Sequence, residues 1–505
     1  MRLSILPFLL HSLVFTNISA PVYGGRYGID TEGMSLEEIL EAGDETLSSN
    51  DPLEAINIYK KGIEQINPEE DSLLTALSLY TNAGTAYSST GDERQAVAMY
   101  ANAIRLYSKE IEEIVDESTQ KYATDIVAQA AFFLGMTHEA LENYRKAADS
   151  YAYAAQLDEY HWAALANLGA LLQDHLKVPA EALQVYNKAY DILTQTDVEP
   201  TDPPEQPKLV LSQLQYRIGL AITYSENQKC VMQNDPDTVV PCSEMAASAF
   251  NYALELDPTN ESAKHMLASV TADATMRRAS NTYVTQLFED YAENFEHSLV
   301  DELGYKGFKI LRSAFDTAFG GKDKVPMFDL VIDAGCGTGL VGEQFRDVSK
   351  TLVGVDLSPS IIEEAVKKRP ELYDEADVGD VTEVFRARKP ISMIIAGDSY
   401  IYFGDLVPLF ESMRDGLMDG GIAAFTLENA SDEFEETLAE TNPDWRWQLQ
   451  PSGRFAHNKN YVEKIGKQVG LEVLYYEEMR GFRKEGANDV NGHIFIMKKT
   501  SSQEL

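Results

Sequence analysis

Apolar residues recur at helical spacing from about residue 36 to residue 270, and a glycine begins each unit of the pattern. Aromatic and small residues follow that glycine at offsets of 3, 12, 16 and 19 positions in two complete units. These units are Gly84, Tyr87, Ala96, Tyr100 and Ala103, and Gly135, His138, Ala147, Tyr151 and Ala154. Segments that begin at Gly43, Gly169 and Gly219 fit the same frame with an insertion or a missing position. The pattern predicts a series of helix pairs in which small residues let neighbouring helices approach closely.

The hydrophobic period changes in the second half of the chain, where short apolar runs alternate with helical segments. We expect strands at 328–333, 351–356, 376–380, 391–397 and 421–428, followed by a closing pair at 471–478 and 492–498. Strands that alternate with helices predict a parallel, doubly wound sheet, and the closing pair would form a hairpin-like edge. The predicted fold class is therefore an α-solenoid followed by an α/β domain.

A glycine-rich turn connects the first predicted strand to the next helix. Residues 328–342 read FDLVIDAGCGTGLVG, with glycines at alternate positions 335, 337 and 339. Gly335, Gly337 and Gly339 have no Cβ, so a ligand can approach the backbone N–H groups at the start of the helix. The second strand ends in Asp356, the usual position of a carboxylate that binds a ribose. A nucleoside-bearing cofactor is expected across these two strand ends.

Two acidic residues distinguish between possible cofactors. Gly337, Gly339 and Gly342 also satisfy the dinucleotide fingerprint, which alone is a weak match. Asp333 ends the first strand, where a carboxylate suits the cationic methionyl end of S-adenosylmethionine and would be unfavourable beside a pyrophosphate. Asp380 ends another short strand, as expected for a group that accepts a hydrogen bond from an adenine amino group. An NAD-dependent oxidoreductase is the less favoured alternative, because it would need a further substrate-binding domain.

This series of residues resembles class I S-adenosylmethionine-dependent methyltransferases. Residues 333–339 (DAGCGTG) correspond to the glycine-loop motif of that family. The helical part resembles the tetratricopeptide repeat. Four further runs resemble a group of predicted methyltransferases fused to such repeats: YVTQLFEDYAENFEHSLVDELGY, AGDSYIYFGDL, SGRFAHN and FRKEGANDVNG. The resemblance implies a tetratricopeptide-repeat (TPR) array at 36–275, including a terminal capping helix, and a Rossmann-like methyltransferase domain at 280–499. It brings no settled substrate.

Candidate residues for the methyl-transfer step lie in three places. Asp398 and Tyr402 follow the fourth strand, where the methyl acceptor normally meets the sulfonium. His457, in an expected loop, is a candidate general base, although a lone loop histidine is more often structural. Tyr291 and Phe295 lie four residues apart before the glycine loop and form either a lid over the cofactor or an apolar docking face. Methyl transfer needs a base only if the acceptor must lose a proton.

Composition narrows the possible partners. Acidic residues outnumber basic ones 81 to 42, which gives a formal charge of −39 over 505 residues. This balance argues against nucleic-acid binding and favours either a basic protein or peptide on the repeat surface or simply a solvated surface. The sequence has no CxxC, HExxH or histidine cluster, so no metal site is expected. Cys230 and Cys242 bracket a polar loop and could pair in an oxidising compartment.

Both ends of the chain carry targeting features. Arg2 precedes an apolar run, Leu3 to Phe15, that is too short to span a bilayer, so residues 1–24 are interpreted as a signal peptide and no transmembrane segment is expected. Residues 500–505 form a tail whose last four residues, SQEL, fit a relaxed retrieval signal of the endoplasmic reticulum. The secretory pathway is the expected location.

A binding protein is the main competing interpretation. A repeat array is a peptide-binding surface in its own right, and a degenerate methyltransferase domain would then serve only as a scaffold. The glycines and the three carboxylates at the strand ends are all present, which favours the enzyme.

Overall fold

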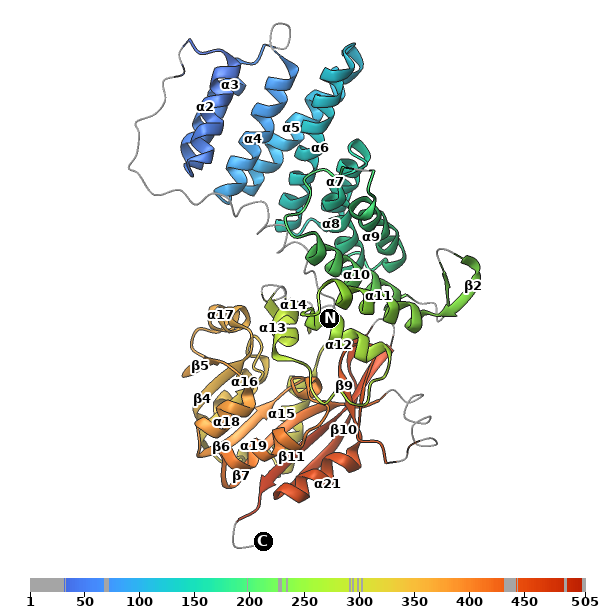
Figure 1. Cartoon of the computed structure of the whole chain (residues 1–505). Helices are drawn as coiled ribbons and strands as arrows, with labels where there is room; N and C mark the ends of the chain where they lie inside the picture. Colours follow the sequence, from blue (N-terminus) through green and yellow to red (C-terminus); the bar gives the residue numbers. More distant parts are fainter. Residues whose placement is uncertain are drawn as a thin grey trace. The chain divides into compact units, whose positions relative to one another are not determined.

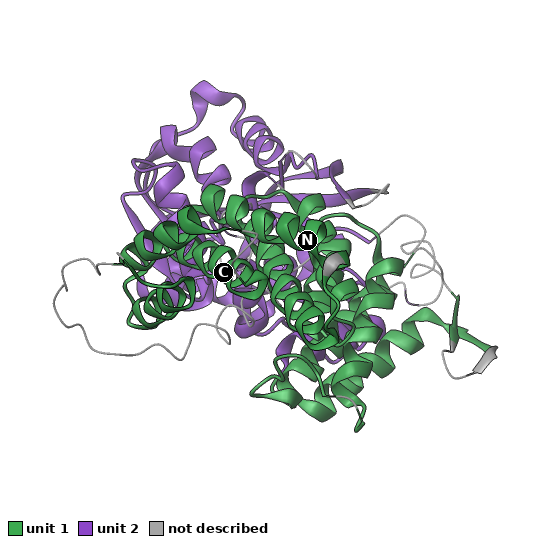
Figure 2. Cartoon of the chain, turned by 90° about the horizontal axis from the view of Figure 1, so that it is seen from above, with its two compact units in different colours: residues 1–259 green, residues 260–505 purple. Residues whose placement is uncertain are grey.

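The structure is a computed structural model. It describes residues 31, 33–67, 72–197, 199–225, 229–232, 235–289, 292, 295–297, 299–300, 303–430, 442, 444–485 and 488–501. The chain forms two compact units, Met1–Thr259 and Asn260–Leu505 (Figure 2). The expected signal peptide, the four C-terminal residues and Tyr291 lie outside the described residues.

The described part of the first unit consists mainly of helices that pack in successive pairs (Figure 1). The helices are α2 (Leu36–Ser48), α3 (Pro52–Gln65), α4 (Leu73–Ser89), α5 (Glu93–Glu110), the 3-10 helix η1 (Ile111–Glu113), α6 (Glu117–Ala140), α7 (Tyr144–Leu157), α8 (Trp162–Asp174), α9 (Pro179–Thr194), α10 (Pro207–Thr223) and α11 (Cys242–Leu256). Aspartates cap several N-termini; Asp92, for example, accepts a hydrogen bond from the backbone N–H of Gln95.

The repeated glycine meets the repeated aromatic in each of the described pairs α2–α3, α4–α5, α6–α7, α8–α9 and α10–α11. A Cβ added at the glycine would lie 2.2–2.6 Å from a ring carbon of its partner. The pairs are Gly43 with Tyr59, Gly84 with Tyr100, Gly135 with Tyr151, Gly169 with Tyr186, and Gly219 with Phe250. All five aromatic side chains are buried. In the first four pairs the offset is 16 or 17 residues, and in the fifth it is 31 because the disulfide-closed loop is inserted. The contact has one physical cause: the ring occupies the space that a larger side chain would fill.

The loop between Cys230 and Cys242 is closed by a disulfide between these two residues. Two short antiparallel strands, β1 (Lys229–Met232) and β2 (Asp235–Pro241), form a hairpin inside it (Figure 1). The sequence left this pairing open.

The second unit contains the predicted sheet. Its strands are β3 (Phe328–Ala334), β4 (Ser349–Asp356), β5 (Glu375–Val378), β6 (Ile391–Ala396), β7 (Leu417–Glu428), β8 (Trp447–Leu449), β9 (Phe455–His457), β10 (Leu471–Glu485) and β11 (Asn488–Lys499). The order is β10-β11-β7-β6-β3-β4-β5, with parallel neighbours from β7 to β5 and antiparallel pairing of β11 with β7 and β10. The doubly wound sheet with an antiparallel edge is thus confirmed.

Helices flank this sheet, and one apolar core joins its strands (Figure 1). The helices are α12 (Glu261–Val270), α13 (Asn281–Glu289), α14 (Phe295–His297), α15 (Gly307–Ala318), α16 (Leu340–Phe345), α17 (Pro359–Lys368), α18 (Val381–Ala387), α19 (Val407–Gly416) and α21 (Lys459–Val469), with 3-10 helices η3 (Lys322–Lys324), η4 (Arg346–Val348) and η5 (Tyr400–Tyr402). Core residues from neighbouring strands are Ile332, Val353, Ile394, Phe425 and Phe495. Because β3 to β7 are parallel, their carboxyl ends meet at one edge of the sheet.

One boundary differs from the expected one. We expected residues 259–276 to cap the repeat array, but α12 belongs to the second unit. Nε2 of His265 lies 2.7 Å from the carbonyl oxygen of Gly453, and Oγ of Ser269 donates to the carbonyl of Gln450 at 2.7 Å. Ala268 packs in one small cluster with residues that precede or belong to β9. Helical periodicity gave the helix correctly but not the surface on which it packs.

No described helix has both the length and the apolar character that crossing a lipid bilayer requires.

Candidate functional site

The glycine loop lies between β3 and α16 and holds a tight backbone path. Gly335, Gly337 and Gly339 have φ values of 68°, 54° and 98°, a region that favours glycine. The backbone N–H groups of Gly335 and Cys336 donate to the carbonyl of Val355 in β4, at 2.8 and 2.9 Å. A Cβ at Gly335 would stand 2.4 Å from Cβ of Ser399, and one at Gly337 would stand 3.1 Å from the ring of Phe295. Side chains of Ser399 and Phe295 therefore pack closely against the loop, and a Cβ at either glycine would crowd them.

Asp333 presents a buried carboxylate at the end of β3. Its side chain has no exposure to solvent, and burial raises the pKa of this carboxyl to about 7. The hydroxyl of Tyr373 donates to Oδ2 at 2.6 Å, whereas Oδ1 has no hydrogen-bond partner among the described residues. A buried carboxylate with one unpaired oxygen fits a cationic group, because such a group would compensate its desolvation.

Asp356, at the end of β4, is tied to the glycine loop. The N–H of Gly337 donates to Oδ2 at 3.0 Å, and the N–H of Ser358 donates to Oδ1 at 3.1 Å. Burial raises the pKa of Asp356, and these backbone bonds oppose the increase. A carboxylate has about four acceptor positions, and the backbone N–H groups of Gly337, Leu357 and Ser358 use three of them. About one position is therefore left for a ligand hydroxyl.

Asp380 is already fully engaged in this conformation. Oδ1 accepts from the N–H and the hydroxyl of Thr382, while Oδ2 accepts from Arg278 at 2.7 Å and from Asn281 at 3.2 Å. Burial raises the pKa of Asp380, but the bonds from Thr382 and the charge of Arg278 outweigh burial and lower it overall. Because all its acceptor positions are used, an adenine amino group reaches Asp380 only if Arg278 or Asn281 releases it. The sequence did not predict this competition.

One glutamate of α13 and one of α14, two helices that precede the glycine loop in sequence, make polar contacts near it. Glu289 at the end of α13 accepts from the hydroxyls of Ser358 and Ser360, at 2.5 and 2.6 Å. Glu296 in α14 forms two bonds with Arg369, at 2.8 and 2.9 Å, and accepts from the hydroxyl of Thr338 in the glycine loop at 3.0 Å. α13 and α14 are thus anchored to the loops after β3 and β4.

The ring of Phe295 packs over the glycine loop. The ring is buried, stands over Gly337, and packs against Phe288, with the ring centroids 5.7 Å apart. Phe288 in turn contacts the ring of Tyr402, with centroids 5.8 Å apart. The Phe295 ring therefore lies over the glycine loop.

The predicted acceptor residues lie beyond the carboxyl end of β6. Asp398 has a φ of 57°, a left-handed conformation that aspartate tolerates better than most residues. Its Oδ2 pairs with Arg483 of β10, and Oδ1 has no partner among the described residues. Tyr402 is buried, and burial raises the pKa of its phenol. The structure therefore brings Asp398 and Tyr402 to the same edge of the sheet as Asp333.

His457 does not have the properties expected of a general base. It belongs to strand β9 rather than to a loop, it is fully buried, and its Nε2 lies 3.1 Å from the carbonyl oxygen of Gly404. Burial lowers the pKa of His457 to about 3. A neutral imidazole with this pKa is a weak proton acceptor near pH 7. We correct the expectation for this conformation: His457 holds β9 against the loop at Gly404.

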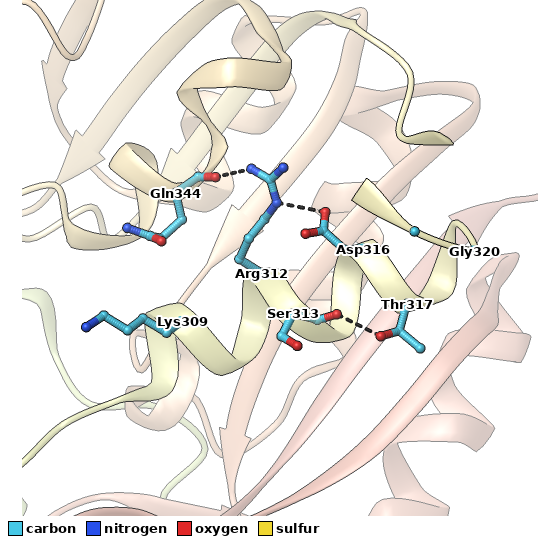
Figure 3. A pocket seen from close by; sticks show the side chains of 8 residues that line it. Lys309, Arg312, Ser313, Asp316, Thr317, Gly320 and Gln344 are labelled. Carbon is cyan, nitrogen blue, oxygen red and sulfur yellow. Dashed lines mark hydrogen bonds and ion pairs between the residues drawn. The ribbon is translucent and has the colours of Figure 1, made fainter. Parts of the chain in front are cut away.

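The pocket shown in Figure 3 lies away from these residues. It has a volume of about 560 Å³ and is lined mainly by α15, including Lys309, Ser313 and Thr317 (Figure 3). Arg312 at its edge is engaged by Asp316, Asp347 and the carbonyl of Gln344. Gln344 is near the C-terminal end of α16, whereas the glycine loop precedes the N-terminal end of that helix. The pocket and the glycine loop are therefore different sites.

Sequence reasoning missed several residues of the site. Tyr373 bonds the predicted Asp333, and Arg369 and Glu289 bond the loops around it, but all three come from segments of ordinary composition that no local motif marks. Arg483 lies in the run FRKEGANDVNG, which was distinctive but carried no assigned chemistry. Within the described parts of the chain, histidines, cysteines and acids do not gather into a group that could hold a metal ion.

Known proteins match the second unit. Residues 305–476 match a family model described as a methyltransferase domain. Over 132 residues the chain is 27% identical to the trans-aconitate 2-methyltransferase of Rhizobium etli; the match covers 25% of this chain and 49% of that protein, so the chain spans about half the length of this curated relative.

Solved methyltransferase structures were also found, at low sequence identity. Magnesium protoporphyrin IX methyltransferase from Synechocystis, solved with bound S-adenosylhomocysteine, is 13% identical, with a TM-score of 0.34 over 44% of this chain and 100% of that one. An S-adenosylmethionine-dependent methyltransferase from Clostridium acetobutylicum is 18% identical, with a TM-score of 0.30 over 42% and 99%. From the family match, the strand order and the glycine loop with its carboxylates, we conclude that the second unit contains a class I S-adenosylmethionine-dependent methyltransferase domain.

Proposed function

We propose that the protein transfers a methyl group from S-adenosylmethionine to an acceptor held beyond the carboxyl end of β6. The observation that carries this proposal is Asp333: a fully buried carboxylate, with Oδ1 unpaired among the described residues, directly before the glycine loop. A dinucleotide would bring a pyrophosphate to this loop, and two like charges in a buried site are unfavourable. The negative charge of Asp333 therefore disfavours the NAD-dependent alternative.

The residues have separate tasks in this proposal. S-adenosylmethionine, when bound, supplies a methyl group on a cationic sulfur that is a good leaving group. Asp333 neutralises the ammonium group of the methionyl end, and Asp356 binds a ribose hydroxyl. Phe295 and the anchored segment around Glu289 and Glu296 exclude water from the loop. The protein therefore contributes mainly position and a dry environment.

The direct test is transfer of a labelled methyl group. The full chain is incubated with labelled S-adenosylmethionine and a heat-treated extract of the source cell, and the label is followed in the protein and small-molecule fractions. The proposal predicts a labelled product with the wild-type chain and at least about tenfold less with Asp356→Ala, which loses a charge-assisted hydrogen bond. Absence of any labelled product would support the scaffold alternative.

We propose further that the first unit is a TPR array that presents a basic protein or peptide to the enzyme. Support comes from the repeated glycine–aromatic contacts and from charge, because residues 1–259 contain 39 acidic and 15 basic residues. The test compares the full chain with residues 260–505, a cut that keeps α12 with the unit on which it packs. A protein substrate would show a sharply higher KM with the shorter chain and an unchanged cofactor affinity. Equal KM values would indicate a small-molecule acceptor.

We also propose that the protein enters the secretory pathway, possessing a signal peptide at 1–24 and a retrieval signal at its C-terminus. The disulfide between Cys230 and Cys242 supports an oxidising compartment. Asn260 and Asn429 each begin an N-glycosylation sequon, Asn-X-Ser. Glycosylation at these sites is a poor reporter of the location, because both asparagines are buried and Asn260 caps α12. The measurement is therefore N-terminal sequencing together with mobility under non-reducing conditions; an intact N-terminus and free cysteines would contradict the proposal.

A further inference from the structure

A buried network of charges lies beyond the carboxyl ends of β6 and β7, next to the cofactor loop. Arg483 pairs with both Asp398 and Glu428, and Nε of Arg454 donates to Glu428 at 3.0 Å. Gln450 also donates to Glu428, at 2.6 Å. The four charged side chains are each at least nine-tenths buried. Since burying charges is costly even when they are paired, a network of this kind at a strand end calls for a functional explanation.

The sheet is distorted in a way that places Arg483 in this network. The register of β10 and β11 shifts between Met479 and Arg483, where Met479 pairs with Gly492 and Arg483 with Val490. β10 therefore has two more residues than β11 across this interval. Gly481 inside the irregularity has a φ of 55°. Such bulges redirect side chains and occur often beside active sites.

Tyr305, from the segment before α15, lies next to this network. The backbone of its neighbours is bonded to β10: the N–H of Lys306 donates to Phe482 at 2.9 Å, and the N–H of Lys484 donates to Leu303 at 2.8 Å. The Tyr305 ring packs edge-on against Phe482. Its hydroxyl would stand 3.2 Å from a Cβ on Gly397, the residue before Asp398.

Two polar atoms in or beside this network lack partners. Tyr305 is buried, yet its hydroxyl has no hydrogen-bond partner among the described residues, and the same is true of Oδ1 of Asp398. Burial raises the pKa of the Tyr305 phenol, as do the charges of Asp398 and Asp333, whereas the charge of Arg483 lowers it. Buried polar groups without partners are rare and call for a ligand that satisfies them.

We propose that Tyr305, Asp398 and Arg483 form the methyl-acceptor site and that the acceptor is an amine, which donates an N–H to Oδ1 of Asp398. The inference rests on the proposed methyltransferase function and names the substrate class. An acceptor carboxylate would place a second negative charge against the unpaired oxygen of Asp398, which is unfavourable in a buried site. A neutral amine adds no charge to the balanced network, and the carboxylate stabilises the positive charge that develops on nitrogen.

The step balances without a further reactant. The nitrogen lone pair forms the new C–N bond as the methyl–sulfur bond breaks, and the electrons of that bond remain on sulfur in S-adenosylhomocysteine. The proton of the methylated nitrogen passes to Oδ1 of Asp398 and then to solvent. Arg483 holds Oδ2 and so orients the carboxylate; it is a positioning residue.

The first experiment identifies the chemical class of the product. The full chain is given labelled S-adenosylmethionine and heat-treated extract, and the product is treated with mild base and passed over a cation exchanger at neutral pH. An N-methyl product keeps its label in base and is retained as a cation. Label released as methanol would identify a methyl ester, and a base-stable product that is not retained would be methylated on oxygen, sulfur or carbon; either result overturns the amine assignment while leaving methyltransferase activity in place.

The second experiment tests the residues with readouts besides activity. Asp398→Asn keeps the size and the left-handed backbone, and we expect turnover to fall about 100-fold with cofactor affinity unchanged by calorimetry. Asp415→Asn, at an exposed ion pair of the same unit, is the control and should match wild type. If Asp398→Asn weakens cofactor binding in parallel with turnover, Asp398 belongs to the cofactor and the proposal is overturned.

Tyr305→Phe separates a substrate contact from a structural role. Removing a buried hydroxyl without a partner should leave the melting temperature unchanged or raise it. A contact with the acceptor predicts that kcat/KM for the acceptor falls about 10- to 100-fold, the loss of one strong hydrogen bond in the transition state. Wild-type kcat/KM in Tyr305→Phe would overturn the assignment. Failure of the wild-type chain to bind S-adenosylmethionine at all would instead reject the proposed function itself.

Discussion

The hydroxyl of Tyr373 donates to Oδ2 of Asp333 at 2.6 Å and leaves Oδ1 of the same buried carboxyl without a partner among the described residues. Tyr373 follows α17 and β4 in sequence, yet it fixes the orientation of the carboxyl at the end of β3. The bond favours the ionised form of Asp333, but burial outweighs it and raises the pKa to about 7. In the cofactor-free protein the carboxyl therefore titrates near neutral pH.

This pKa predicts a pH dependence of cofactor binding. Only the ionised carboxyl pairs with a cationic ammonium group, so affinity for S-adenosylmethionine should fall by up to about tenfold per pH unit below pH 7. Calorimetry between pH 5.5 and 7 measures this slope. Asp333→Asn should bind more weakly at pH 7 and show no slope in this range. An affinity that is constant over the range in the wild-type protein would contradict the proposed role of Asp333.

Asp380 leads to a prediction about Arg278. Because Arg278 and Asn281 occupy the oxygen that an adenine amino group would need, Arg278→Ala should raise the affinity for S-adenosylmethionine, by about tenfold if one charged hydrogen bond is removed from the competition. Arg277→Ala is a matched control, since the Arg277 side chain is largely exposed and pairs with Asp405 instead. Weaker cofactor binding in Arg278→Ala would mean that this arginine holds the site together rather than competing for Asp380.

Replacing a glycine of the first unit by alanine should lower the stability of that unit more than such a small change usually does. In Gly169→Ala the new Cβ would lie 2.5 Å from the ring of the buried Tyr186, and such overpacking costs about 1–3 kcal/mol. At Gly62 the nearest atom would be 3.0 Å away, so Gly62→Ala should destabilise the unit less. Combining Gly169→Ala with Tyr186→Leu should cost less than the sum of the two changes. Thermal unfolding of the full chain gives the comparison, and additive effects would argue against direct contact.

Replacing the buried His457 should change the stability of the protein rather than its catalysis. The pKa of His457 is about 3 in the folded protein and near 6.5 when unfolded, so the unfolded state binds the extra proton as pH falls. The contribution of His457 is present above pH 6.5 and is lost as pH decreases toward 3, by up to about 1.4 kcal/mol per unit.

The measurement is denaturant unfolding followed by tryptophan fluorescence, since Trp447 lies in β8, the partner of β9. Unfolding free energies of wild type and His457→Gln should converge between pH 7 and pH 5. Turnover of the variant at pH 7 should fall less than about tenfold, below the range expected for loss of a general base. A loss of about 100-fold with an intact fold would restore the catalytic role.

Features with a local signature were predictable from the sequence. The strand ends at Asp333 and Asp356, the glycine turn between them and the spacing of glycine and aromatic in the helix pairs each follow from short-range pattern. A helix was predicted within 259–276, where α12 lies, but not its partner surface, because helical periodicity shows which face is apolar and not what covers it. β9 was expected to be a loop because its three residues are too few to show an alternating pattern.

The network around Asp398 could not be predicted, for a different reason. Arg483 reaches Asp398 only because β10 carries an irregularity at Gly481, and Tyr305 reaches the same place because its segment adds to the edge of β10. These contacts join residues more than 80 positions apart, and no spacing in the sequence encodes them. The opposite error occurred at His457, where residue type suggested chemistry and burial removed it.

The most direct test of the account is cofactor binding by the full chain, measured by calorimetry with S-adenosylmethionine and with NAD at pH 7.5. The account predicts binding of S-adenosylmethionine only, and a loss of about 1.5–3 kcal/mol of binding free energy in Asp356→Ala, which removes a charge-assisted ribose contact. Binding of NAD with no response to S-adenosylmethionine would contradict it.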